Sequence, residues 1–231
     1  MNWRLKVAAF KALSWLPGGK SFYRFTQKNL TGSLRATEAR VSQKLDIGLL
    51  YLDWLTAHDL GDMLLFGSHL DFGAGWHPTI PLLYYSMGVE RQYLFDVTPL
   101  LDDSLVRETV QIFLSIVNSP GWRPRARLRR LPPQMGNKPW REYLEALSIT
   151  YQAPYESAFG GLAAGLNVVT STQVLLHIPR PVLAGCFTRI YSCLRPGGIF
   201  WRRSTSAICS LARSRPTTIN CATRTRPGNV G

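Results

Sequence analysis

The sequence has few acidic residues, few cysteines and no long apolar run, and each shortage excludes a class of protein. No run of 18 apolar residues occurs in the 231-residue chain, so no transmembrane helix is expected. The four cysteines form no C-x-x-C pair and have no histidine at ligand spacing, which excludes a zinc site and predicts no metal. Since nothing else indicates export, they are interpreted as free thiols of a cytoplasmic protein. Their positions are 186, 193, 209 and 221.

The shortage of acids leaves a formal net charge of +13, from 27 Lys and Arg against 14 Asp and Glu. Six arginines lie in residues 201–231, which contain no acid, and five more lie in residues 121–130. A basic protein raises nucleic acid as a partner, but these clusters lack the interleaved aromatic residues that stack bases. RNA binding or RNA methylation is therefore an alternative that we do not favour. It would use Arg123, Arg125, Arg127, Arg129 and Arg130.

Residues 1–60 are predicted to form an N-terminal helical cap. Apolar residues recur at helical spacing in residues 1–16 and again in residues 38–58. Lys11 interrupts the first run and no small-residue cleavage site follows it, so no signal peptide is expected. The basic helix at 1–16 either packs on its own domain, which we favour, or contacts a membrane surface.

Residues 61–200 alternate short apolar runs with amphipathic segments. This alternation predicts an α/β fold, a Rossmann-like and mostly parallel sheet with helices on both faces. Residues 118–141, rich in Pro, Arg and Gly, are predicted to be a long inserted loop or lid. The five expected strands lie in S-H-L-D-F, R-Q-Y-L-F-D, L-S-I-T-Y, L-N-V-V-T-S-T and from I-F-W onward.

The stretch H-L-D-F-G-A-G-W-H-P, residues 69–78, is typical of a cofactor loop. Gly73 and Gly75 remove side chains where the backbone must turn sharply and approach a ligand, and the helix that follows presents free N–H groups. Asp96 ends the next strand, where its carboxylate can accept hydrogen bonds from ribose hydroxyls. A dinucleotide motif needs Gly or Ala where Pro78 stands, so the loop does not fit a dinucleotide.

These residues resemble the class I S-adenosylmethionine-dependent methyltransferases, of the type 11 kind. Asp71, Gly73 and Gly75 match the first motif of that family, acid-x-G-x-G, and Asp96 matches the acid that closes its second strand. The segment N-V-V-T-S-T-Q-V-L-L-H-I-P resembles its fourth-strand motif, with Asn in place of the usual Asp. The segment L-R-P-G-G-I-F at 194–200 resembles the turn before its fifth strand.

The resemblance implies that S-adenosyl-L-methionine is the cofactor and that a small molecule accepts the methyl group. The glycines would lie beneath the methionine part and Asp96 would hold the ribose, while the adenine and substrate sides involve later residues. Methyl transfer depends chiefly on proximity, so a base is optional, and His177 is the candidate. The implied cofactor-binding residues are Asp71, Gly73, Gly75, Asp96, Val97, Thr98, Thr170 and Ser171.

The regular pattern stops at Phe200. The last strands of the sheet are therefore expected to be missing, and residues 201–231 to be a disordered basic tail. One hypothesis is a frameshift near codon 200, because a one-nucleotide shift lets W-R-R-S-T-S-A-I-C read L-A-E-I-D-L-S-D-L; the other is a natural basic tail. A truncated, catalytically inactive methyltransferase relative is accordingly the alternative to an active enzyme.

Overall fold

The structure is a computed structural model that describes residues 35–154, 165–178, 180–203, 207–212 and 220–223. The chain divides into two compact units, Met1–Ala36 and Thr37–Gly231, and every element below belongs to the second. The helix predicted at residues 1–16, with its membrane alternative, lies outside the described residues. None of the helices within the described ranges is both long and apolar enough to cross a membrane.

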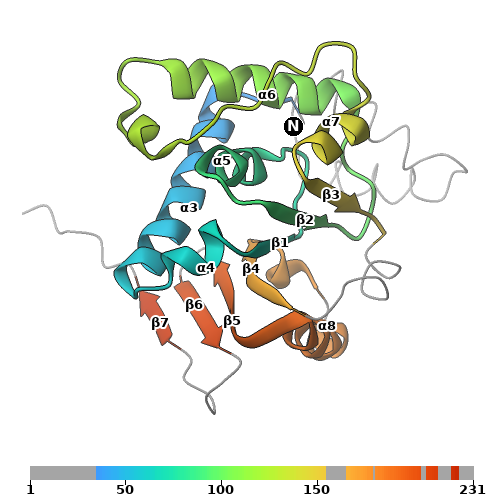
Figure 1. The fold of residues 1–231 in the computed structure, drawn as a ribbon. Coiled ribbons are helices and arrows are strands. Elements are labelled where there is room, and N and C mark those ends of the chain that lie inside the picture. The colour runs from blue at the N-terminus through green and yellow to red at the C-terminus, as the bar shows by residue number, and fades with distance from the viewer. Residues whose placement is uncertain (1–34, 155–164, 179, 204–206, 213–219, 224–231) are drawn as a thin grey trace, which may run out of the picture. The chain divides into compact units, whose positions relative to one another are not determined.

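A seven-stranded sheet with the order β3-β2-β1-β4-β5-β6-β7 forms the centre of the second unit (Figure 1). The first five strands pair in parallel, which confirms the predicted Rossmann-like sheet. The chain order reverses beside β1, and in such sheets ligands bind outside the carboxyl ends of the strands at this point. These strands are β1 Ser68–Phe72, β2 Arg91–Phe95, β3 Ile149–Gln152, β4 Leu166–Thr172 and β5 Leu194–Arg203.

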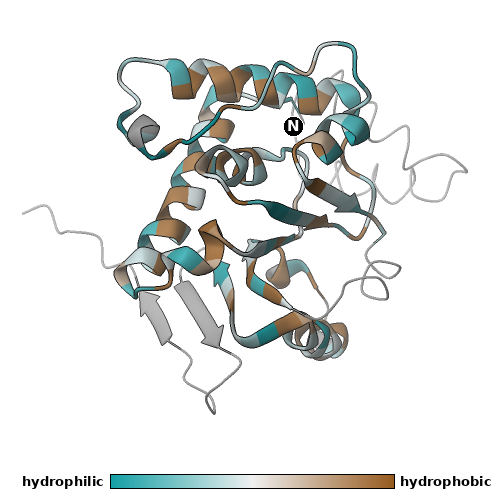
Figure 2. Ribbon diagram, in the orientation of Figure 1, coloured by the Kyte–Doolittle hydropathy of each residue, from teal (hydrophilic) through white to brown (hydrophobic). Residues whose placement is uncertain are grey.

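Helices cover both faces of this sheet. On one side α3 packs against both α5 and α6, and on the other α8 packs against β5. Helix α6 begins where the carboxylate of Asp102 accepts hydrogen bonds from the amides of Ser104 and Leu105. Hydrophobic and hydrophilic residues alternate along α6 (Figure 2). The helices are α3 Glu38–Ala57, α4 Gly61–Leu65, α5 Thr79–Met87, α6 Asp103–Asn118, α7 Trp140–Ala146 and α8 Arg180–Cys193.

The two faces of the central strands differ in chemistry. Leu70, Phe72 and Val169 belong to an apolar cluster that includes Cys186 and Ile190 of α8. Because side chains alternate along a strand, their neighbours in β1 and β4 lie on the opposite face. Three buried residues on that face are polar, His69, Asp71 and Thr170, and they lie beside the buried, apolar Val168. Buried polar groups need partners, so this face is where a site is expected.

The prediction that the last strands are missing is wrong. Strand β6, Ala207–Ala212, pairs antiparallel with β5, and β7, Asn220–Thr223, pairs antiparallel with β6. The prediction of a disordered tail is therefore also wrong for these residues. The physical reason is that the edge of β5 offers unpaired backbone groups, which short strands can satisfy without a long periodic pattern. Residues 204–206, 213–219 and 224–231 lie outside the described residues.

The loop at 118–141 lies partly at the far end of α5 from the glycine loop. The amides of Arg129 and Arg130 donate to the carbonyl of Ser86, near the end of α5. The Arg130 guanidinium lies 3.9 Å from the centre of the Tyr85 ring, and Arg127 forms a 2.7 Å ion pair with Asp53. These arginines therefore hold the loop on the domain, and this part of it is not a lid over the strand ends.

Candidate functional site

The glycine loop turns back over the end of β2. The amides of Gly73 and Ala74 donate to the carbonyl of Phe95, at 2.8 and 3.1 Å. Gly73 and Gly75 have φ angles of +84° and +71°, in the left-handed region that favours glycine. A Cβ at Gly73 would overlap the side chain of Val174 and lie 2.8 Å from its Cβ. Both glycines are therefore required by the backbone, as the sequence predicts.

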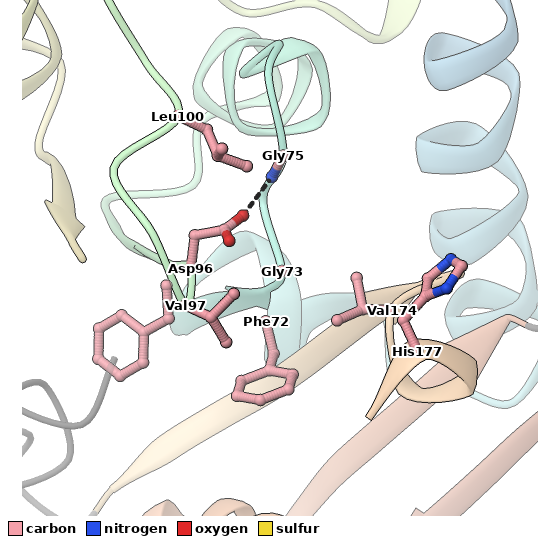
Figure 3. A pocket seen from close by; sticks show the side chains of 9 residues that line it. Phe72, Gly73, Gly75, Asp96, Val97, Leu100, Val174 and His177 are labelled. Atoms are coloured by element: carbon pink, nitrogen blue, oxygen red, sulfur yellow. Dashed lines mark hydrogen bonds between the residues drawn. The ribbon is translucent and has the colours of Figure 1, made fainter. Parts of the chain in front are cut away.

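Asp96 lies immediately after β2 and closes the loop from the other side. Its Oδ2 accepts a hydrogen bond of 2.9 Å from the amide of Gly75, shown as the dashed line in Figure 3. Burial raises the pKa of Asp96, while hydrogen bonds from the amides of Gly75, Thr98 and Val97 act in the opposite direction. The acid and the glycine that the sequence singles out are thus in direct contact.

Asp71 lies beneath the loop, on the polar face of the sheet. Its Oδ1 accepts a hydrogen bond of 3.2 Å from the hydroxyl of Thr170, its registered partner on β4. The same hydroxyl lies 2.9 Å from Nε2 of His69. Since the Thr170 proton goes to Asp71, His69 Nε2 is assigned as the donor to Thr170. Burial raises the pKa of Asp71 to about 6, against the lowering effects of Lys44 and Thr170.

Lys44 is a site residue that the sequence analysis missed. It projects from α3, and its Nζ donates to the carbonyl of His77 at 2.9 Å and to that of Ala74 at 3.3 Å. The only signal in the sequence is a lysine on the apolar face of a predicted helix, three residues after the buried Val41 and one before the buried Leu45. His77 is itself buried, with Nδ1 3.3 Å from the hydroxyl of Thr109.

A pocket of about 190 Å³ opens beside the loop (Figure 3). Its lining is largely apolar, with Asp96 and His177 as its titratable groups. His177 lies on the short 3-10 turn Leu175–His177 after β4 and is exposed. Val97 is 51% exposed at the same edge. The lining residues are Phe72, Gly73, Gly75, Phe95, Asp96, Val97, Leu100, Val174 and His177.

The structure brings together some of the predicted site residues and separates others. Five of them line the pocket, namely Gly73, Gly75, Asp96, Val97 and His177. Asp71, Thr170 and Ser171 are each at most 4% exposed and lie outside this lining. Thr98 is exposed beside the pocket, and its carbonyl accepts a hydrogen bond from the Tyr151 hydroxyl. The roles of these residues toward a cofactor remain predictions.

Two predicted features concern metals and thiols. Within the part of the chain that the structure describes, His, Cys, Asp and Glu form no group of three that could hold a metal ion. Cys186 and Cys193, both on α8, are buried, and neither is in a disulfide. Cys209 and Cys221 lie in β6 and β7. The cysteines of α8 belong to the apolar cluster and take no part in the pocket.

No protein-family model and no curated protein sequence matches this chain. Solved structures that match it include magnesium protoporphyrin IX methyltransferase from Synechocystis PCC 6803, solved with S-adenosylhomocysteine. It is 15% identical, with 79% of this chain and 71% of that chain covered and a TM-score of 0.42. A candidate sarcosine dimethylglycine methyltransferase from Galdieria sulphuraria is also 15% identical, with 69% and 48% covered and a TM-score of 0.37.

The [4+2]-cyclase SpnF also matches, at 16% identity, with 59% of this chain and 38% of that chain covered and a TM-score of 0.32. This chain spans about half the length of the first two structures that it matches, 48% and 47%. Identities and scores as low as these carry no argument about the activity of this chain. What it binds must be inferred from its own residues.

Proposed function

We propose that this chain binds S-adenosylmethionine at the carboxyl ends of β1 and β2 and transfers its methyl group to a small-molecule acceptor. The contact between Asp96 and Gly75 carries the proposal, because it places a carboxylate beside a glycine loop at the point where the strand order reverses. An ionised carboxylate can accept about four hydrogen bonds. Bonds from the amides of Gly75, Val97 and Thr98 use about three of these, which leaves acceptor capacity for about one ribose hydroxyl.

The pocket and the residues that line it could hold one portion of such a cofactor. The pocket of about 190 Å³ is smaller than the roughly 300–1,000 Å³ of typical ligand sites, so it suits one portion of the molecule. Its apolar side chains, Phe72, Val97 and Leu100, suit a flat heterocycle such as adenine better than a charged amino acid group. The ribose would then lie against Asp96 and the amino acid part toward Gly73 and Gly75.

When bound, S-adenosylmethionine supplies a sulfonium methyl group with a good leaving group. The contribution of this chain is to hold the cofactor and the acceptor in line, since most of the rate of such a transfer comes from proximity and orientation. His177, exposed at the rim of the pocket, is the candidate to take a proton from the acceptor. Its role as a base is a proposal, as are the acceptor and the activity of this chain.

The test is isothermal titration calorimetry of the whole chain with S-adenosylmethionine, and with NAD as the control for general ribose binding. We expect heat with the first ligand and none with the second, because Pro78 stands where a dinucleotide needs Gly or Ala. A methyl-transfer assay with labelled cofactor and a small-molecule extract follows. No heat with S-adenosylmethionine contradicts the proposal, and binding without transfer to any component supports the inactive relative.

A further inference from the structure

A lysine from outside the sheet holds the glycine loop. The Nζ of Lys44, on α3, donates to two carbonyls of the loop, those of Ala74 and His77, at 3.3 and 2.9 Å. A Cβ built on Gly75 would lie 3.8 Å from this Nζ. The ammonium therefore lies directly beside the residue whose amide donates to Asp96.

Titratable groups of α3, α5, β1 and the residue after β2 lie around Lys44. Burial lowers the pKa of Lys44, while Asp71 at the end of β1 and Asp96 after β2 raise it. The phenols of Tyr51 on α3 and Tyr84 on α5 lie near Asp71, and Arg40 together with Lys44 lies near His77. Lys44 is thus a cation that acts on both carboxylates.

We propose that Lys44 is a positioning residue of the cofactor site, which fixes the backbone of residues 74–77 and balances the charges of Asp71 and Asp96. The identity of the ligand rests on the proposed function, but the action on the loop does not. Through Lys44, α3 becomes part of the site and is more than a cover over the sheet.

Loss of Lys44 has two separable consequences. The carbonyls of Ala74 and His77 lose a charged donor, and a hydrogen bond to a charged group contributes more than a neutral one. Without this anchor the amide of Gly75 is held less firmly toward Asp96. Asp71 also loses the positive charge that favours its ionised form. The first effect is on loop geometry and the second is on proton binding.

Three substitutions separate hydrogen bonding from charge. Lys44→Met removes both, Lys44→Gln keeps an N–H donor without the charge, and Lys44→Arg keeps both. Lys138→Met, at an exposed lysine outside the pocket, is the matched control. The readouts are amide hydrogen exchange of Gly75 and the titration of the Asp71 carboxyl carbon by nuclear magnetic resonance, both on the free protein.

We expect Lys44→Met to speed the exchange of the Gly75 amide by about 10-fold or more, with smaller changes for Gln and Arg. The titration midpoint of Asp71 should rise in the Met and Gln variants and stay unchanged in the Arg variant. A lysine that only stabilised the fold would not make the Asp71 midpoint differ between the charged Arg variant and the uncharged Met and Gln variants. Unchanged exchange and an unchanged midpoint in Lys44→Met overturn the proposal; if that variant does not fold, the Gln and Arg variants decide through the midpoint.

Cofactor binding gives a third and independent readout. If the wild-type chain binds S-adenosylmethionine, Lys44→Met should weaken binding by about 10-fold, because the loop is less ordered before the ligand arrives. If the wild-type chain does not bind it, the proposed function fails while the exchange and titration results still decide the role of Lys44. The two failures are therefore distinguishable.

Discussion

The amide of Gly75 and the carboxylate of Asp96 are joined by a 2.9 Å hydrogen bond, although 21 residues separate them in the chain. Strand β2 and helix α5 lie between them in sequence, and the parallel pairing of β1 with β2 brings their ends together. The bond orders the loop before any ligand binds. It also gives Asp96 a structural role beside the ligand-binding role that we propose for it, and substitutions can separate these two contributions.

Asp96→Asn and Asp96→Ala should differ in loop order, and both should weaken ligand binding. Asparagine keeps an acceptor for the Gly75 amide, whereas alanine leaves that amide unpaired at a cost of about 1–3 kcal/mol of unfolding free energy. Both remove the charge that strengthens hydrogen bonds to ribose hydroxyls, so both should weaken S-adenosylmethionine binding by about 10-fold or more. Urea unfolding and calorimetry measure the two effects. Equal stability of the Asn and Ala variants contradicts the structural part.

Gly73→Ala and Gly75→Ala form a matched pair at two positive φ angles. Each should lose about 1–2 kcal/mol, because a side chain disfavours the left-handed region. Gly73→Ala should lose about 1–3 kcal/mol more, since its Cβ would overlap Val174, whereas a Cβ at Gly75 would be in ordinary contact with Lys44 at 3.8 Å. Unfolding free energies in urea give the comparison.

The overlap with Val174 has its own control. Val174→Ala alone should cost little, because Val174 is only half-buried, and it should recover the additional loss when combined with Gly73→Ala. Combining Val174→Ala with Gly75→Ala should recover none of the stability that Gly75→Ala loses. If the combined variant is no more stable than Gly73→Ala alone, overlap with Val174 is not the cause of the additional loss.

Acid should destabilise the fold through His69. Burial lowers the pKa of His69 to about 3 from its ordinary 6.5, so as the pH falls below 6.5 the unfolded chain takes up a proton that the folded chain does not. His77, with its pKa lowered to about 4, acts in the same direction. The pKa of Asp71, raised to about 6, acts oppositely, because its stability contribution is lost as the pH rises through about 4 to 6.

Each histidine lowers stability on acidification with a slope of at most about 1.4 kcal/mol per pH unit for each proton, and the raised pKa values of Asp71 and Asp96 oppose this slope. His69→Gln keeps a donor for Thr170 and should reduce this slope by about one proton between about pH 6 and pH 4. Urea unfolding at several pH values measures it. A slope equal to that of the wild type would show that His69 titrates normally in the fold.

The sequence predicted the parts of the site that depend on local rules. Gly73, Gly75 and Asp96 could be found because glycine marks a positive φ, and because the carboxyl ends of parallel strands meet at one edge. The buried position of Thr170 could not, since it depends on the register that places it opposite Asp71. Lys44 was missed because helical periodicity predicts which face of a helix is buried, but it does not predict which segment of the chain packs against that face.

The C-terminal strands were missed for a different reason. The segments at 207–212 and 220–223 are short, at six and four residues, and their composition resembles that of a disordered segment. Their pairing is determined by the open edge of β5, a feature of the sheet as a whole. Likewise, the arginines of 121–130 indicated a charged surface, but their contacts with Asp53 and Tyr85 are set by tertiary structure.

The arginine contacts predict an effect on stability and no role in RNA binding. Arg130→Met should lose about 1–2 kcal/mol, since Nε and one terminal nitrogen donate to the carbonyls of Tyr85 and Val89. Arg127→Met should lose at most about 1 kcal/mol, because its ion pair with Asp53 is exposed. Filter binding of RNA at rising salt is the check on function. Tight binding that falls steeply with salt would favour the RNA alternative.

His177→Gln tests the last step of the proposed reaction. The histidine lines the pocket on the turn after β4, on the opposite side of Val174 from the carboxylate of Asp96 in Figure 3. A general base contributes roughly 10²- to 10⁴-fold to a rate, whereas an exposed side chain contributes little to stability. The variant should therefore lose transfer activity by at least about 100-fold, while its cofactor affinity and unfolding midpoint stay close to those of the wild type.

His58→Gln is the matched control, because His58 is also exposed but stacks on Trp54 at the end of α3, outside the pocket. Full activity in His177→Gln would mean that proximity alone drives the transfer, as the chemistry of a sulfonium methyl allows.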